Sequence, residues 1–122
     1  MNYIIVSFGA ALGGALRYWV SNITYKYLPA YFPYGTLLVN IVGSFILGLI
    51  MFNLDQRELI NSQLKIFLTI GFCGGFTTFS TFSYETINLF KDSQIFLGFV
   101  NILASVLLSL LGILLAYFIS KI

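Results

Sequence analysis

The chain has 122 residues, of which 59% are hydrophobic and only 8% are charged. Soluble domains carry about 25% charged residues, so this composition excludes an ordinary soluble surface and indicates a membrane protein. The net charge of +2 is too small to indicate a nucleic-acid partner. Cys73 is the one cysteine and histidine is absent, which excludes an intrachain disulfide and argues against an enzyme.

Four apolar stretches are long enough to cross a membrane, for which a helix needs about 20 residues. The predicted spans are Tyr3–Tyr25, Tyr34–Asn53, Lys65–Asn88 and Gln94–Ser120. No basic region precedes the first stretch, so we expect a mature helix there and not a removable signal peptide. The predicted fold class is an all-α membrane protein with four transmembrane helices per subunit, in one transmembrane domain over residues 1–122.

Basic residues are spread almost evenly over the two ends of the predicted spans. Arg57, Lys65 and Lys121 lie at the end that carries both termini, and Lys26 and Lys91 lie at the other. Because Lys and Arg in the loops set orientation, so weak a bias favours insertion both ways up. Two oppositely oriented copies could then pair about an axis in the membrane plane, which predicts an antiparallel, dual-topology dimer.

Small residues recur four positions apart, which places each pair on one helix face where another backbone can approach closely. These pairs are Gly9 and Gly13, Ser44 and Gly48, and Gly71 and Gly75. They are consistent either with a subunit boundary or with packing inside one subunit.

The third stretch holds an unusual segment from Gly71 to Ser83, with three glycines, five hydroxyl residues and four phenylalanines. Gly74-Gly75 followed by Thr77-Thr78 weakens a helix through backbone entropy and β-branching, so we predict that this helix is broken near its middle. Carbonyls freed at the break must be buried in protein or meet water or an ion. Carbonyls from both subunits could surround sodium, or the break could be a kink that the threonine hydroxyls stabilise.

After the predicted break, Phe79 and Phe82 share a helix face, and Ser80, Thr81 and Ser83 supply hydroxyl donors near them. The edge of an aromatic ring is electropositive, so two edges beside such donors could attract a small, partly dehydrated anion. The alternative is that aromatic residues at helical spacing form ordinary core.

Polar residues also occur inside the second and fourth spans. Asn40 lies mid-span in the second, and Asn101, Ser105 and Ser109 follow one face of the fourth. They could line a polar pathway or form hydrogen bonds between helices.

A charged residue, Arg17, interrupts the first span. It is costly in apolar surroundings unless it is paired or reaches the interface, and its charge would favour anions at a pore mouth. Glu85 is the natural opposite charge, near the far end of the third span.

Three segments, Gly13–Tyr18, Gly35–Gly43 and Gly71–Ser83, make the chain resemble the CrcB, or Fluc, family of bacterial fluoride channels over essentially its whole length. The resemblance implies a dual-topology homodimer with two antiparallel pores and a structural sodium ion at the dimer centre. It also implies roles for individual residues: Phe79 and Phe82 as pore phenylalanines, Asn40 as the pore asparagine, Gly74 and Thr77 as carbonyl donors to sodium, Arg17 at the aqueous vestibule, and Glu85 as the acid after the phenylalanines. In the fourth span Ser105 and Ser109 fit the family's polar track, whereas Asn101 stands where a tyrosine is commonly expected.

The function we expect is therefore passive, fluoride-selective efflux through a multi-pass protein of the plasma membrane, which would protect the cell against fluoride. The main alternative is a small proton-coupled exporter of the multidrug type, which also has four spans and dual topology. Such an exporter needs a carboxylate in an early helix, and this chain has no acidic residue before Asp55. A membrane adaptor that transports nothing would have no use for the polar centre of the third span.

Overall fold

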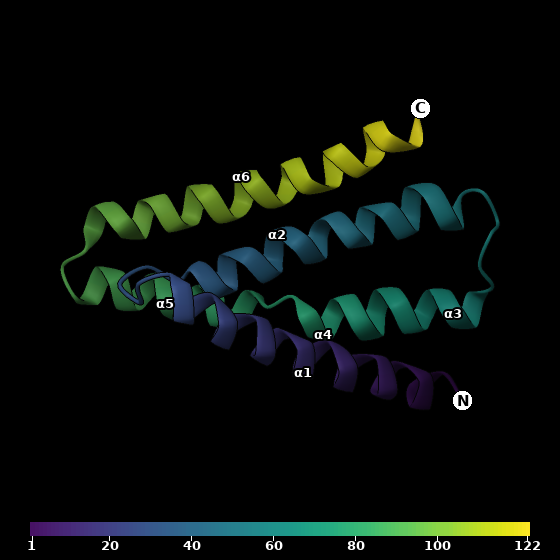
Figure 1. The fold of residues 1–122 in the computed structure, drawn as a ribbon, viewed down its shortest axis with the longest axis horizontal. Helices are drawn as coiled ribbons and strands as arrows, with labels where there is room; N and C mark the ends of the chain where they lie inside the picture. The colour runs from purple at the N-terminus through teal and green to yellow at the C-terminus, as the bar shows by residue number, and fades with distance from the viewer.

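Four helical spans lie side by side in the computed structural model, which describes all residues from Met1 to Ile122 (Figure 1). The elements are α1 (Asn2–Tyr27), α2 (Tyr34–Leu49) with the π-helical segment η1 (Ile50–Asp55), α3 (Ser62–Ile66) with the π-helical segment η2 (Phe67–Cys73), α4 (Gly74–Phe76), α5 (Phe79–Lys91) and α6 (Ile95–Ser120). Each span is long and apolar enough to cross a membrane. The four predicted spans are confirmed, and the bend in the third lies where the sequence places it.

Both termini lie at one end of the bundle, together with the connection from η1 to α3 (Figure 1). The connections from α1 to α2 and from α5 to α6 lie at the other end. The α5–α6 turn includes Ser93 at φ 63°, and the Gln94 amide closes it by donating to the Leu89 carbonyl at 2.8 Å. An even number of spans thus returns the chain to the side from which it starts.

Helix α1 packs backbone to backbone against the first half of the third span. A Cβ on Gly13 would overlap the Phe72 carbonyl oxygen, and a Cβ on Gly75 would lie 2.6 Å from the Ala10 carbonyl oxygen. Gly9 and Gly71 face each other in the same way, with the Gly71 Cα 3.0 Å from the position of a Cβ on Gly9. These glycine pairs therefore serve packing within one chain, where only a hydrogen atom fits between the two helices.

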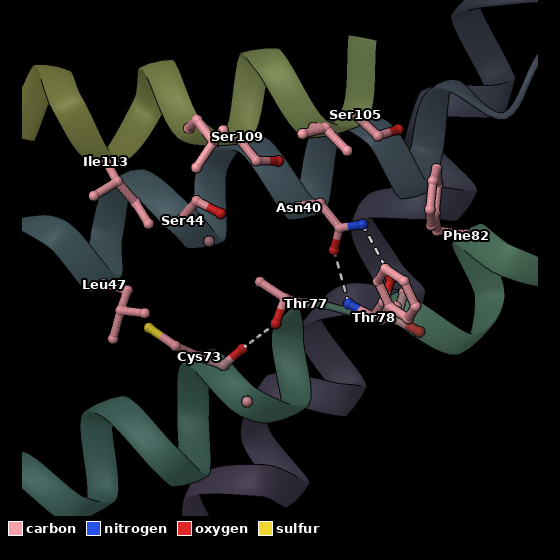
Figure 2. Close-up of a pocket in the computed structure, with 15 residues that line it drawn as sticks. Asn40, Ser44, Leu47, Cys73, Thr77, Thr78, Phe82, Ser105, Ser109 and Ile113 are labelled. Carbon is pink, nitrogen blue, oxygen red and sulfur yellow. Dashed lines mark hydrogen bonds between the residues drawn. The ribbon is translucent and has the colours of Figure 1, made fainter. Parts of the chain in front are cut away.

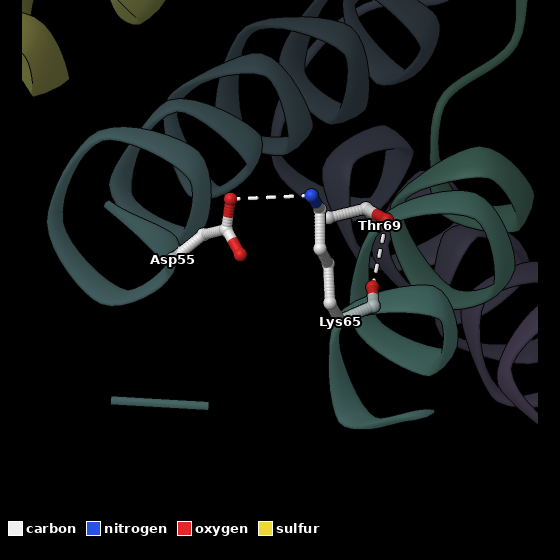
Figure 3. Close-up of polar contacts among 3 residues, drawn as sticks. All are labelled: Asp55, Lys65 and Thr69. Carbon is white, nitrogen blue, oxygen red and sulfur yellow. Dashed lines mark hydrogen bonds and ion pairs between the residues drawn. The ribbon is translucent and has the colours of Figure 1, made fainter. Parts of the chain in front are cut away.

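Helix α2 packs against α6 along most of its length, and Gly48 provides a close approach to Ala116. Near the terminal end of the bundle, the Lys65 ammonium lies 3.2 Å from the Asp55 carboxylate and joins η1 to α3 (Figure 3). The Thr69 hydroxyl donates to the Lys65 carbonyl at 2.7 Å in the same place. Because both charged side chains are about one-third exposed, this ion pair orients the two spans more than it stabilises them.

Most of the chain's apolar surface faces outward, as expected for a bundle with lipid as its solvent. Only 22 of 122 residues are buried, and large side chains such as Phe8 and Leu110 are exposed. A single chain therefore has a small core, and close backbone packing at its glycines has to hold the helices together.

The glycine contacts can be tested with two neighbouring residues of α1. Gly13→Ala should destabilise the protein by about 1–3 kcal/mol, because the added methyl meets rigid backbone on the third span. Gly14→Ala is the matched control, since a Cβ there has nothing within 4 Å and alanine favours helix. Thermal unfolding in detergent, followed by the fluorescence of Trp19, measures both. Equal midpoints for the two variants would contradict the packing described above.

Candidate functional site

The third span is interrupted at Thr77 and Thr78, whose backbones are extended at ψ 160° and 119°. The break predicted near Gly74-Gly75 and Thr77-Thr78 is confirmed. Threonine hydroxyls satisfy backbone groups on both sides of it: Thr77 donates to the Cys73 carbonyl at 2.9 Å, and the Thr78 hydroxyl accepts from the Thr81 amide at 3.2 Å. The break is therefore a defined backbone geometry, with α4 ending before it and α5 beginning after it.

Asn40 of α2 holds the break in place through two hydrogen bonds to a single residue. Its side-chain nitrogen donates to the Thr78 carbonyl at 3.0 Å, and its oxygen accepts from the Thr78 amide at 2.7 Å (Figure 2). One amide side chain thus satisfies both polar backbone groups of a residue that belongs to no helix. Buried backbone groups without partners are costly, so this pairing is a condition for the break to exist inside a membrane.

The carbonyls of Gly74 and Thr77 are among those that lose at the break the donors they would have in a continuous helix. There, Thr78 would donate to the Gly74 carbonyl and Thr81 to the Thr77 carbonyl. Here the Thr78 amide donates to Asn40 instead, and the Thr81 amide donates to the Thr78 hydroxyl. The carbonyls of Gly74 and Thr77, the two predicted sodium ligands, therefore lack these donors.

Arg17 meets the break from α1, since its Nε donates to the Gly75 carbonyl at 3.0 Å. The guanidinium is partly buried and does not pair with Glu85. Glu85 lies on the α5 side, where it lines a second hollow together with Tyr25 and Asp92, and one of its carboxylate oxygens is buried without a hydrogen-bond partner. Arg17 and Glu85 are thus separate features of the site.

A cavity of about 410 Å³ lies between α2, the broken third span and α6 (Figure 2). No charged side chain lines it. The polar side chains on its wall are one amide, several hydroxyls and a thiol, and the apolar ones are aliphatic side chains and two phenylalanine rings. Its lining includes Asn40, Ser44, Cys73, Gly74, Thr77, Thr78, Phe79, Phe82, Ser105 and Ser109.

The two phenylalanines stand at the α5 side of this cavity with ring centroids 5.4 Å apart and planes inclined at 50°. Phe82 is 8% exposed, whereas Phe79 is 77% exposed on the outer face of the chain. The pair therefore extends from the interior of the bundle to its surface.

Three of the predicted hydroxyl donors lie beside the phenylalanines but do not line the cavity: Ser80, Thr81 and Ser83. The Ser83 hydroxyl donates to the Phe79 carbonyl at 3.0 Å, as serines inside helices often do. The Ser80 hydroxyl is exposed and lies 3.4 Å from the Thr78 hydroxyl.

The polar residues of α6 divide into two groups. Ser105 and Ser109 line the cavity, as a pathway requires. Asn101 is 1% exposed and donates to the Thr86 hydroxyl at 2.9 Å, so it forms a hydrogen bond between helices, the alternative to lining a pathway. Thr86 was not among the predicted residues, although its position one turn after Phe82 places it on the same face of α5.

These features define a multi-pass membrane protein in which a broken helix and neutral polar side chains line a cavity inside an apolar bundle. The chain matches the family model described as CrcB-like protein, Camphor Resistance (CrcB), over residues 4–117, and it belongs to this family. The chain is a multi-pass protein of the cell membrane.

Curated relatives carry one shared name, fluoride-specific ion channel FluC. A relative from Dehalococcoides mccartyi is 52% identical over 111 residues, which cover 88% of this chain and 83% of that protein. One from Clostridium novyi is 49% identical over 119 residues, which cover 98% and 93%. One from Geotalea daltonii is 48% identical over 107 residues, which cover 88% and 86%. The similarity therefore spans most of this chain and most of each relative.

Proposed function

We propose that this chain is a fluoride-selective ion channel through which fluoride leaves the cytoplasm passively, so that the cell is protected against fluoride. The observation that carries the proposal is the uncharged cavity where two phenylalanine rings meet amide and hydroxyl groups. A small anion needs donors in place of its water, and a fixed positive charge would hold it too tightly to conduct. The relatives' shared name supplies the identity of the anion.

In the mechanism we infer, the partly buried charge of Arg17 attracts the anion toward the bundle. The side chains of Asn40, Ser105 and Ser109 then replace part of its hydration shell, and the edges of the two phenylalanine rings supply further positive potential. Hydrofluoric acid crosses membranes and ionises in the cytoplasm. The negative interior then drives the anion outward by about 2.3 kcal/mol per 100 mV, and no other energy source is needed.

The cavity wall also bears on the exporter alternative. A proton-coupled exporter requires a carboxylate that the substrate can reach, and no carboxylate lines the central cavity. Glu85 lines the other hollow, toward one end of the bundle. The cavity therefore favours a channel.

We infer further that two copies of the chain assemble in opposite orientations. Gly74, Phe79 and Ser80 are exposed at the break, where a freed carbonyl could not face lipid. A second copy provides the cover that this region needs. The near-equal number of basic residues at the two ends of the bundle supports the antiparallel arrangement, because it favours insertion both ways up.

A structural sodium ion at the dimer centre is part of the same proposal. The carbonyls of Gly74 and Thr77 have lost their helix donors, and they are neutral oxygens of the kind that suits a monovalent cation. These two carbonyls from each copy would hold the ion. Bound there, the cation would offset the repulsion between carbonyl oxygens that would otherwise face one another across the interface.

Efflux from liposomes that contain only this polypeptide tests the function. We expect rapid release of fluoride and a chloride release slower by at least about tenfold, because the larger ion fits the path poorly. Phe79→Ile should reduce fluoride release by about tenfold or more, since the aliphatic side chain lacks a positive edge. Phe96→Ile is the matched control, because Phe96 is also 77% exposed but lies at the start of α6. Equal loss in both variants, or equal chloride release by the wild type, would contradict the proposal.

Antiparallel assembly is tested by labelling introduced cysteines in a Cys73→Ala background. Asn61 and Asp92 lie in connections at opposite ends of the bundle. With dual topology, an impermeant thiol reagent outside the cell should label about half of the molecules at either position. Labelling of one position only would show a single orientation.

Sodium binding predicts that stability depends on the cation present. Replacing sodium by N-methylglucamine should lower the unfolding temperature, because a ligand that binds only the folded state stabilises it. The midpoint should rise with sodium concentration and not with the concentration of N-methylglucamine. Identical unfolding midpoints in the two solutions would contradict the proposed sodium site.

A further inference from the structure

Helices α5 and α6 meet through matching faces, and successive contacts lead along them toward the cavity. Beginning at the connecting turn, Phe90 packs against Gly98, and Thr86 is hydrogen-bonded to Asn101. One turn further along each helix, Phe82 and Ser105 both line the cavity. On α5 these residues are four positions apart, and on α6 they are three or four apart, so each set faces one direction. The middle pair, Thr86 and Asn101, is polar and does not line the cavity.

The hydrogen bonds of this middle pair form a continuous series. Asn101 donates to the Thr86 hydroxyl at 2.9 Å, and Thr86 donates to the Phe82 carbonyl at 2.7 Å. The side-chain oxygen of Asn101 accepts from Ser105 at 3.3 Å. Asn101 thus connects one cavity residue on its own helix with the backbone of another on α5.

Burial separates Asn101 from the pathway. Its side chain is 1% exposed, and that of Thr86 is 5% exposed. Asn101 is absent from the cavity wall, and both its nitrogen and its oxygen have protein partners. Burial therefore separates this amide from an ion in the cavity.

The hydrogen bond between Asn101 and Thr86 affects the position of the Phe82 ring. This ring is 8% exposed and lines the cavity one helical turn from Thr86, so its place along the pathway depends on how α5 sits against α6. The Asn101–Thr86 hydrogen bond is a directional link between those helices. Gly98 contacts the Phe90 ring only through van der Waals packing, which resists sliding less than a hydrogen bond does.

We propose that Asn101 is a positioning residue for the channel: through Thr86 it holds Phe82 at its place in the pathway, and it makes no contact with the permeating ion. The inference rests on the proposed function, which it deepens.

The test is a double-mutant cycle of fluoride efflux from liposomes. Thr86→Val keeps the shape of the side chain and removes its hydroxyl, and Asn101→Leu removes the amide at similar volume. We expect each to slow efflux by about tenfold and the double variant to be no slower than either single one, because all three lose the same interaction. Thr86→Ser, which keeps the hydroxyl, should conduct within about twofold of the wild type.

Thr24→Val is the matched control for removal of a buried threonine hydroxyl. Thr24 is 7% exposed and donates to the carbonyl four residues before it, as Thr86 does, but it has no partner on α6. This variant should conduct like the wild type. If Thr86→Val also conducted like the wild type while Asn101→Leu did not, or if the two losses multiplied, the proposal would be overturned and Asn101 would act on the ion itself.

A second measurement does not require conduction. 4-Fluorophenylalanine at position 82 reports the surroundings of the ring through its fluorine NMR signal in detergent. Thr86→Val and Asn101→Leu should displace this signal alike, while Thr86→Ser and Thr24→Val should leave it in place. An unmoved signal in both of the first two variants would overturn the proposal. If wild-type liposomes released no fluoride, the proposed function would be wrong, and the fluorine signal would still decide whether Asn101 positions Phe82.

Discussion

The two hydrogen bonds between Asn40 and the backbone of Thr78 are the interaction on which the rest of the site depends. A helix that crosses a membrane satisfies every amide and carbonyl internally, and an interruption at mid-span is tolerated only if something else does so. Asn40 supplies both an acceptor and a donor from a neighbouring helix. Once Thr78 is satisfied in this way, the preceding carbonyls are released and α5 can begin in a new direction.

Glycine contacts between α1 and the third span also help to hold the break in place. Because Gly13 and Gly75 bring α1 against the first half of the third span, Arg17 is close enough to donate to the Gly75 carbonyl. The break is therefore held from two helices, by an amide on α2 and a guanidinium on α1. With only 22 of 122 residues buried, such directional contacts matter more here than in a soluble domain with a larger core.

The two phenylalanines beside the break differ sharply in exposure. Phe82 is buried and Phe79 is exposed, although the two rings lie 5.4 Å apart and border one cavity. Neutral donors surround them, and the nearest fixed charges lie outside the cavity wall. This combination suits an ion that must shed water, pass quickly and leave.

The sequence by itself determined the four spans and the broken third span. The reason is that apolar length, glycine pairs and β-branched residues act locally along the chain. Only the tertiary structure decided which partner each polar group takes. Arg17 donates to Gly75 and leaves Glu85 apart, Asn101 pairs with Thr86, and Ser83 turns to its own helix. Hydrogen bonds between spans depend on how the helices are rotated and displaced against one another, and the spacing of residues along a single span does not encode this arrangement.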